Sequence, residues 1–530
     1  MSAQIAEHQG TTRLIETARP LSRSLLWGLQ RRFYEQAGAA AWGNGPVPYY
    51  ITSTPLLARA YAKLVLGFLR DCAAQDLLDR TSPVYLLELG AGSGRFSFHF
   101  RRRLDELLAR SPFRDLQVTL VMSDFAAATV EHWRQRAEFA PWVAEGRIDF
   151  AHFDLERDQE LCLMASGVVL RPGIVGNPIV CIANYVFDRV PQDAFRIEHG
   201  EMVELLAELS VAEGPGEATL DDLRLCFHPR AIGADHYGRM DFDCLLQEYR
   251  ACREGTQVLL PVAALDCVTR LRALGGGRML LVAGDKGYGA VADFPVDAGP
   301  VLAGHGSRSM MVNFDAIGRV ARAAGGVAWC PSARALGLHV GAFLFGISPG
   351  DAAECDLAYW EAIDSGGPDD FFAVQMAVER PCCDWELDQI IAYLRLAGWD
   401  SHIFHCCLPA IRAGLAVVRP KQRDALLAAI AAVDAAYLPT GEPYNLVFDL
   451  GLLLLELDQF AAAAAQFAKS LLRHGPDCAT LLERGISLFR MGNLEEAMQQ
   501  VDLVLALDPT NPVAQQLQSL ILRSILSLTE

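Results

Sequence analysis

The chain has 530 residues, more than one hydrophobic core usually organises, so two or three domains are expected. Its 52% hydrophobic and 21% charged residues are typical of globular proteins, and a formal net charge of −18 opposes binding to nucleic-acid backbones. The 14 cysteines are scattered, no apolar run is long enough to span a membrane, and residues 1–16 lack the pattern of a secretory signal. We therefore expect a cytoplasmic protein that binds neither membrane nor nucleic acid.

Residues 1–80 are predicted to form a helical N-terminal region. Leu14–Tyr34 and Leu56–Leu78 place apolar residues at helical spacing, and the segment Gly43–Pro48 between them marks a loop.

Residues 81–350 are predicted to form an α/β domain, because short β-rich runs alternate there with helices. This alternation indicates a mostly parallel sheet that is covered on both faces. The seven predicted strands are Val84–Leu89, Gln117–Met122, Ile148–Phe153, Ile179–Ala183, Met279–Ala283, Gly326–Cys330 and His339–Ile347.

The segment between the fourth and fifth predicted strands is longer than one crossover helix needs. It contains a strand-like run at Arg196–Leu209 and a helix around Asp241–Cys252, so we interpret residues 190–275 as an insertion. Because this insertion follows a strand end, we expect it to lie beside the active face and to carry acceptor specificity.

Residues 351–530 are predicted to form an all-α repeat domain. Gly451 and Gly485 stand one 34-residue period apart, each is followed twelve residues later by an alanine, and a proline ends each unit. This pattern is typical of tetratricopeptide units, here at about 444–477 and 478–511; an ordinary alanine-rich helical bundle is the alternative. Since two units are too few for a stable stack, degenerate helix pairs are expected to precede them.

A glycine-rich loop is the strongest single motif of the chain. The predicted strand Val84–Leu89 contains Glu88 and runs into Gly90, Gly92 and Gly94, after which a helix begins. Glycines let a ligand approach the backbone closely, and a helix N-terminus favours an anionic group. A dinucleotide fingerprint would need a glycine where Arg95 stands. The pattern E-x-G-x-G-x-G instead resembles motif I of class I methyltransferases; a nicotinamide or flavin enzyme and a structural turn are the alternatives.

Acidic residues end the next two predicted strands. Asp124 follows the second strand, where a carboxylate can bind both ribose hydroxyls, and Asp154 follows the third, where it can accept from an adenine amino group. Each has an alternative role as a solvated loop carboxylate or a helix cap. The predicted cofactor is S-adenosyl-L-methionine, and the residues predicted to bind it are Glu88, Gly90, Gly92, Gly94, Asp124 and Asp154.

The fourth predicted strand runs into Asn184 and Tyr185, and Asp188 follows three residues later. Methyl transfer from a sulfonium is a displacement in which positioning supplies much of the acceleration, with a base added when the nucleophile is protonated. Asn184, Tyr185 and Asp188 are therefore the predicted catalytic residues. Asp285 and His305 are further candidates, although a lone histidine in a loop is more often incidental.

Two cysteine-containing clusters invite a metal-binding interpretation. Cys382-Cys383 and His405-Cys406-Cys407 contain no C-x-x-C pair, and adjacent cysteines on a helix point in different directions. We interpret these cysteines as buried small hydrophobic residues and predict no metal site.

The segment Ile182–Pro191 resembles the MidA-like methyltransferases, the family of the mitochondrial complex I assembly methyltransferase, whose pattern there is approximately A-N-E-x-F-D-A-x-P. Looser similarities extend the resemblance over about residues 30–350 and leave the repeats outside it. The resemblance implies a class I methyltransferase fold and arginine methylation on a protein partner, where a carboxylate can orient the guanidinium. This chain has Tyr185 in place of that glutamate, so we predict that arginine is not its preferred acceptor. Further departures are Arg189 for a small residue, Lys286 for tyrosine and Asn313 for aspartate.

The sequence thus predicts a Rossmann-like class I methyltransferase sheet of seven strands with a large insertion, followed by an all-α tetratricopeptide-type domain. The leading functional hypothesis is an S-adenosylmethionine-dependent methyltransferase acting on a protein or peptide that the repeats recruit. A small-molecule methyltransferase that uses its repeats to form a homodimer is one alternative. A scaffold that binds S-adenosylmethionine without catalysis is another.

Overall fold

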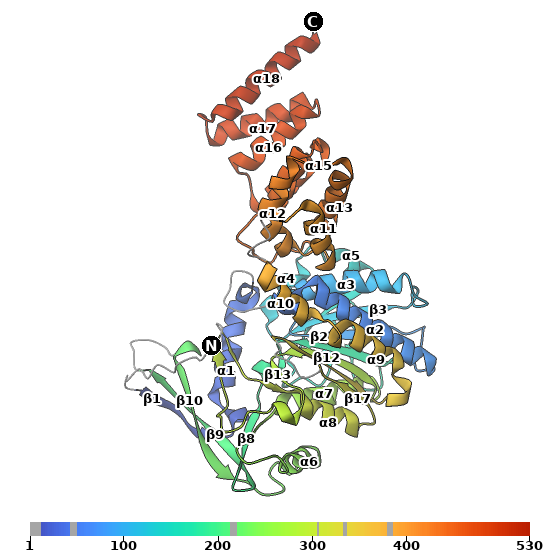
Figure 1. Ribbon diagram of the computed structural model, residues 1–530, viewed down its shortest axis with the longest axis vertical. Coiled ribbons are helices and arrows are strands. Elements are labelled where there is room, and N and C mark those ends of the chain that lie inside the picture. The colour runs from blue at the N-terminus through green and yellow to red at the C-terminus, as the bar shows by residue number, and fades with distance from the viewer. Residues whose placement is uncertain are drawn as a thin grey trace. The chain divides into compact units, whose positions relative to one another are not determined.

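A computed structural model describes residues 12–42, 50–212, 220–304, 307–331, 337–378 and 385–529. The chain divides into two compact units, Met1–Val374 and Gln375–Glu530 (Figure 1). The candidate His305 and the pair Cys382-Cys383 lie outside the described residues. Among the described residues, no helix is both long enough and apolar enough to cross a lipid bilayer.

A mixed seven-stranded sheet organises the first unit. The strands that neighbour one another are, in order, β17 (Val327–Trp329), β18 (His339–Phe345), β12 (Met279–Asp285), β7 (Ile179–Asn184), β2 (Val84–Leu89), β3 (Val118–Asp124) and β4 (Ile148–His152). The five strands from β4 to β12 are parallel, β18 runs antiparallel to β12, and β17 runs antiparallel to β18. Numbered along the chain, the order is 3-2-1-4-5-7-6. All seven predicted strands are confirmed as members of this one sheet.

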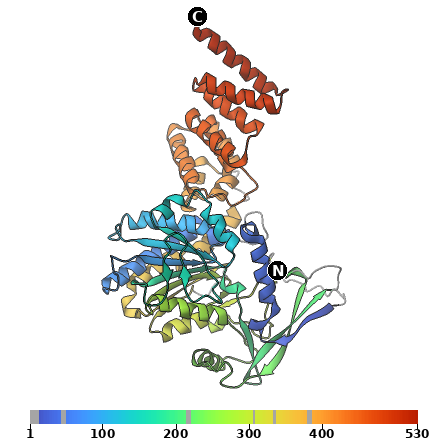
Figure 2. The same ribbon diagram turned by 180° about the vertical axis from the view of Figure 1, so that it is seen from behind.

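Helices cover both faces of this sheet, which explains why its central strands are apolar nearly throughout. On one face α2 (Pro55–Ala74) packs against α3 (Arg95–Leu108) and α9 (Ala353–Tyr359). On the other face lie α7 (Val262–Leu274) and α8 (Phe314–Ala323) (Figure 2). The helix predicted at Leu56–Leu78 is thereby confirmed as α2.

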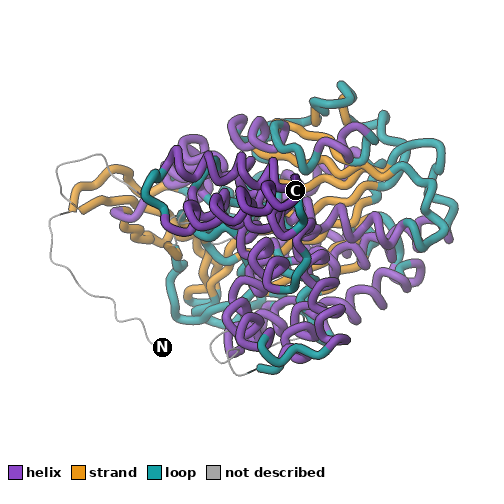
Figure 3. Tube along the Cα trace, turned by 90° about the horizontal axis from the view of Figure 1, so that it is seen from above, coloured by secondary structure: helices purple, strands orange, loops and turns teal. Residues whose placement is uncertain are grey.

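A second, antiparallel sheet forms most of the predicted insertion. Its strands are β1 (Thr12–Arg19), β8 (Asp193–Glu198), β9 (Glu201–Ala212), β10 (Leu223–Ala231) and β11 (Gln257–Leu260). Figure 3 shows these strands apart from those of the main sheet. The predicted helix of the insertion is α6 (Met240–Tyr249).

The helix predicted from Leu14 is wrong at its beginning, because Thr12–Arg19 is a strand that pairs with β9. The side chain of Glu16 stabilises the transition from strand β1 to the helix that follows it. Its buried carboxylate accepts hydrogen bonds from Ser24 Oγ at 2.6 Å and from Leu25 N at 2.9 Å. Ser24 in turn caps the helix α1 (Leu25–Ala37), whose side chains reach the site described below.

The second unit consists of consecutive helices that pack as hairpins. These helices are α11 (Leu387–Leu396), α12 (Ser401–Leu415), α13 (Pro420–Ala436), α14 (Leu446–Glu456), α15 (Phe460–His474), α16 (Cys478–Arg490), α17 (Leu494–Leu507) and α18 (Pro512–Thr529). The two predicted repeat units correspond to the hairpins α14–α15 and α16–α17. A Cβ at Gly451 would lie 2.6 Å from the Phe467 ring, so a glycine is needed where these two helices touch. The helical nature of this region is confirmed, and its tetratricopeptide type stays a prediction.

The cluster His405-Cys406-Cys407 lies within α12. The His405 ring stacks on Tyr444 with 3.7 Å between ring centroids, and Cys407 is buried. Among the residues that the structure describes, no group of three His, Cys, Asp or Glu side chains is placed to hold a metal ion.

Candidate functional site

The glycine loop joins β2, the central strand of the main sheet, to the N-terminus of α3. Gly90, Gly92 and Gly94 have φ angles of 60°, 55° and 74°, in the left-handed region that side chains rarely adopt. A Cβ on Gly92 would lie 3.0 Å from Trp42 Cε2, and one on Gly90 would lie 3.1 Å from Val186 Cγ2. The loop is therefore glycine-rich both because of its backbone angles and because other groups approach it closely.

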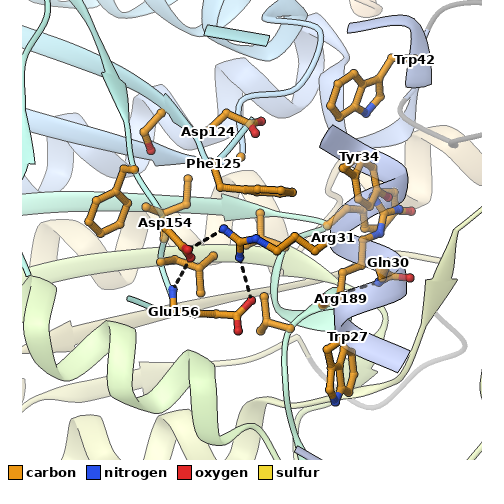
Figure 4. A pocket seen from close by; sticks show the side chains of 18 residues that line it. Trp27, Gln30, Arg31, Tyr34, Trp42, Asp124, Phe125, Asp154, Glu156 and Arg189 are labelled. Atoms are coloured by element: carbon orange, nitrogen blue, oxygen red, sulfur yellow. Dashed lines mark hydrogen bonds and ion pairs between the residues drawn. The ribbon is translucent and has the colours of Figure 1, made fainter. Parts of the chain in front are cut away.

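Two adjoining pockets open on this loop. The first, of about 770 Å³, lies between α1 and the carboxyl ends of β3 and β4 (Figure 4). The second, of about 460 Å³, lies between the glycine loop, Glu88 and the end of β7. Trp42, Gly90, Tyr185 and Arg189 line both pockets, so these four residues mark their junction.

Glu88 is the carboxylate of the second pocket. Its side chain is almost fully buried and accepts a hydrogen bond of 2.5 Å from Ser97 Oγ of α3. Burial raises the pKa of Glu88 to about 7, while the Ser97 hydrogen bond opposes that shift. The carboxyl group is thus poised between its neutral and charged forms near neutral pH.

Asp124 is the last residue of β3 and lines the first pocket. Its Oδ1 accepts a hydrogen bond from Ala126 N at 2.8 Å, which fixes the side chain in the turn after the strand. Burial raises the pKa of Asp124 to about 6, and backbone N–H groups around the carboxylate limit the rise.

Asp154 also lines the first pocket, where it is paired with an arginine from α1. Arg31 Nη2 donates a hydrogen bond of 2.5 Å to Asp154 Oδ2, and Arg31 Nη1 lies 3.6 Å from Glu156 Oε1. The same guanidinium lies over the Phe125 ring, 4.6 Å from its centroid (Figure 4). No local pattern predicts this contact, because 123 positions separate Arg31 from Asp154.

Asn184 and Tyr185 lie at the carboxyl end of β7 and line the second pocket. Asn184 Oδ1 accepts a hydrogen bond of 2.8 Å from the Tyr61 hydroxyl of α2. Tyr185 has a φ of 53°, and its backbone N donates to Gly284 O at 2.8 Å. A bulky residue in this backbone region is strained, and such strain persists where the surroundings enforce it. Here it places the tyrosine ring at the junction of the pockets.

Asp188 lies in the turn Phe187–Arg189 and lines neither pocket. Its Oδ1 is 3.5 Å from Arg189 Nε. Behind it, Asp285 at the end of β12 is fully buried, and its Oδ2 accepts a hydrogen bond of 3.0 Å from Phe187 N. Burial first, and the nearby Asp188 second, raise the pKa of Asp285 well above its ordinary range. Burial and the neighbouring carboxylate thus both favour the neutral form of Asp285.

The structure thus brings the predicted Glu88, Asp124, Asp154, Asn184 and Tyr185 to one site beside the glycine loop. It turns Asp188 away from the pockets and places its neighbour Arg189 there instead. Arg31, Tyr34 and Trp42 also line the first pocket and were not predicted.

No protein-family model matches the chain, and no curated protein matches it either. Two solved structures from Burkholderia thailandensis are similar to it. One is a COG1565 superfamily member and likely methyl transferase bound to S-adenosyl-homocysteine, with 16% identity and a TM-score of 0.38, covering 58% of this chain and 73% of its own. The other is an uncharacterised COG1565 superfamily protein with 16% identity and a TM-score of 0.37, covering 59% of this chain and 74% of its own.

Proposed function

We propose that this chain is an S-adenosyl-L-methionine-dependent methyltransferase whose cofactor lies along the Gly90–Gly94 loop. One observation carries the proposal: a left-handed glycine loop joins the central strand to a helix N-terminus and opens on two adjoining pockets with buried carboxylates. Ligands of open α/β sheets bind at the carboxyl ends of the strands where the strand order reverses, and β2 and β7 flank that point here. The seven strands of this sheet also agree with the class I methyltransferase sheet implied by the sequence resemblance.

The residues of the site fit this cofactor part by part. Asp124 would accept hydrogen bonds from the ribose hydroxyls, and Asp154 from the adenine amino group. Glu88, in the second pocket, would pair with the methionine ammonium. Gly90 and Gly92 leave room for a ligand against the backbone. When bound, the cofactor would supply an electrophilic methyl group on its sulfonium sulfur.

A dinucleotide cofactor fits less well. The dinucleotide fingerprint requires a third glycine for close packing of helix on strand, and Arg95 stands at that position. Arg95 is buried, and its guanidinium lies 5.2 Å from the Tyr50 ring centroid. The glycine that the dinucleotide fingerprint requires is therefore replaced here by a large buried side chain.

The chain's own contribution to the reaction would be positioning and exclusion of water. Tyr61 holds Asn184 at the end of β7, and the aromatic side chains of Tyr34, Trp42 and Tyr185 enclose the pockets. Fixing two reactants in line for displacement can supply a large share of the rate acceleration without a catalytic base.

The acceptor that we propose is a protein or peptide recruited by the helical hairpins of the second unit. Stacked hairpins form extended binding surfaces in repeat proteins, and a net charge of −18 would attract a basic partner. A tritiated-methyl assay with the full chain and host lysate tests this directly. Label in acid-precipitated protein is the expected result, and label confined to small molecules would favour a small-molecule methyltransferase that uses its hairpins to dimerise.

The cofactor proposal is tested by calorimetry and thermal denaturation. S-Adenosylmethionine and S-adenosylhomocysteine should both bind, and ligand at 100 times its Kd should add about 2.7 kcal/mol to the free energy of unfolding. Gly92→Ala should abolish binding, because the added methyl group enters the second pocket beside Trp42. Gly167→Ala is the matched control, since Gly167 has a φ of 73° and nothing within 4 Å of an added Cβ. Absence of any shift with either ligand at millimolar concentration would overturn the proposal.

A further inference from the structure

Building on the proposed function, we infer that Arg189 is a binding residue for a carboxylate group of a ligand in this site. Two ligands could carry that carboxylate: the amino-acid part of the cofactor, or the methyl acceptor. Either way, Arg189 would set which ligands the junction of the two pockets accepts.

The position of Arg189 is the first support. The residue ends the turn that follows β7 and lines both pockets. Figure 4 shows its place in the first pocket, near Arg31 and Gln30 of α1. Only 14% of the side chain is exposed. A ligand that extends from the first pocket into the second must therefore pass beside this guanidinium.

The guanidinium is held in place without using its hydrogen-bond donors. It lies between two aromatic rings, 5.6 Å from the Tyr34 centroid and 5.7 Å from the Tyr185 centroid. Nε is 3.5 Å from Asp188 Oδ1 and makes no hydrogen bond. Within the described ranges, no residue accepts a hydrogen bond from this guanidinium. Nε is buried without an acceptor, a state that costs free energy, and a ligand oxyanion that enters the junction would find the donors of this guanidinium unused.

Arg31, the other arginine of the first pocket, already uses its hydrogen-bond donors. Arg31 donates to Asp154 and lies close to Glu35 and Glu156, so three carboxylates surround its charge. Among the residues that the structure describes, Asp188 is the one charged partner of Arg189 at contact distance. Arg189, and not Arg31, is therefore the arginine with donors free for a ligand.

The geometry favours a carboxylate over other ligand groups. A guanidinium is a planar fork whose parallel N–H groups match the two oxygens of a carboxylate, and the flanking rings hold the fork in one orientation. A cationic group at the same place would meet the positive charge of the Arg189 guanidinium in a partly buried cavity, where Asp188 on the other side of the turn offsets part of that charge. The junction would thus discriminate against an acceptor guanidinium or ammonium.

A carboxylate acceptor would also need no base. A carboxylate is already ionised at neutral pH, so it can attack the sulfonium methyl carbon directly. The new C–O bond forms as the C–S bond breaks, and the electron pair of that bond passes to sulfur, giving a neutral thioether and no proton. In an acceptor whose nucleophile is another atom, the carboxylate would serve as an anchor.

The first arm of the test measures binding of S-adenosylhomocysteine and of 5′-methylthioadenosine, which lacks the amino-acid part, by calorimetry on the full chain. If the carboxylate belongs to the cofactor, Arg189→Met should weaken S-adenosylhomocysteine by about 10- to 100-fold and leave the nucleoside unchanged. Arg189→Lys, which keeps the charge and loses the fork, should fall between. Arg224→Met, at an exposed position on β10, is the matched control.

The second arm uses benzoate and its neutral counterpart benzamide as probes, with and without saturating S-adenosylhomocysteine. If the carboxylate belongs to the acceptor, the cofactor-loaded chain should prefer benzoate at least tenfold, and Arg189→Met should lose that preference while keeping its affinity for S-adenosylhomocysteine. The inference is wrong if the Met variant changes neither cofactor affinity nor the benzoate preference.

Ligand-side comparisons keep the inference testable even if the Met variant fails to fold. In the wild-type chain, equal binding of S-adenosylhomocysteine and its decarboxylated analogue, together with equal binding of benzoate and benzamide, would overturn it. A chain that binds benzoate through Arg189 but no S-adenosylhomocysteine would instead contradict the proposed function and leave the carboxylate site standing.

Discussion

Replacing Glu88 with glutamine removes a buried carboxyl group that titrates and keeps nearly the same shape. Burial raises the pKa of Glu88 from 4.5 to about 7 in the folded chain. Because the folded pKa lies above the unfolded one, this group contributes most to stability below pH 4.5, and its contribution declines as the pH rises to about 7. A shift of this size corresponds to roughly 3 kcal/mol in the free energy of unfolding.

The measurement is urea denaturation of the wild type and Glu88→Gln at pH 5 and at pH 8, followed by tryptophan fluorescence. Other titrating groups are shared, so they cancel in the difference between the two proteins. Relative to the wild type, the variant should gain roughly 2–3 kcal/mol in free energy of unfolding between pH 5 and pH 8. A difference that stays constant between the two pH values would refute the reasoning, because it would mean that Glu88 titrates alike in both states.

The same titration should affect ligand binding. Below its pKa, Glu88 is neutral and cannot pair with the methionine ammonium. The affinity for S-adenosylhomocysteine should therefore fall as the pH decreases from 8 to 6.5, and Glu88→Gln should abolish that dependence while binding more weakly at pH 8. An unchanged pH dependence in the variant would assign it to another group.

Two further predictions concern other parts of the chain. Arg31→Gln should tighten S-adenosylhomocysteine binding several-fold by calorimetry, because it frees the Asp154 oxygen that would accept from the adenine amino group; unchanged affinity would show that Asp154 does not contact the base. Gly451→Ala should lower the free energy of unfolding of the second unit by about 1–3 kcal/mol without altering cofactor affinity, because its Cβ would meet the Phe467 ring. The control is Gly414→Ala, because a Cβ at Gly414 would make only an ordinary contact of 3.7 Å with Leu387 Cβ. This change should be neutral or slightly stabilising, and equal effects at both positions would contradict the packing argument.

The main sheet could be predicted because its signals are local. Strands covered on both faces consist of almost continuous apolar runs, and Val84–Leu89 and Met279–Asp285 are such runs that end at a glycine or a charged residue. Parallel strands bring their carboxyl ends to one edge, so the side chains that follow them meet there. Glu88, Asp124 and Asn184 could be assigned to one site for this reason.

Contacts between distant segments could not be predicted in the same way. The strand Thr12–Arg19 pairs with a strand almost 200 residues later, and its own sequence fits a helix nearly as well. Arg31, on the helix that follows this strand, contacts Asp154 across 123 positions of the sequence. The helical hairpins of the second unit were easier to predict, because each hairpin contacts mainly its neighbours in the sequence.

The short turn after β7 shows a second limit. Spacing along the chain predicts that residues 184–189 lie near the site, but a single turn of 3₁₀ helix does not follow the period of either a strand or an α-helix. Whether Asp188 or Arg189 faces the pockets depends on what packs behind the turn. Here the buried Asp285 binds the turn's backbone N–H groups, so the Asp188 side chain lies on the inner side and Arg189 lines the pockets.

The charged residues of this turn differ from the MidA-like pattern in a way that bears on which acceptor the site would prefer. Relative to the pattern A-N-E-x-F-D-A-x-P, the chain lacks a negative charge at Tyr185 and gains a positive one at Arg189, and both residues line the junction of the pockets. Asn313, another departure, lies elsewhere and caps α8. Two changes of the same sign at one place would make the junction less favourable for a cation, because charges in a partly buried cavity are screened less than at the surface. A carboxylate in the site would favour a guanidinium acceptor, whereas a guanidinium in the site would favour a carboxylate. Arg189 is therefore a second residue, besides Tyr185, that supports the prediction that arginine is not the preferred acceptor.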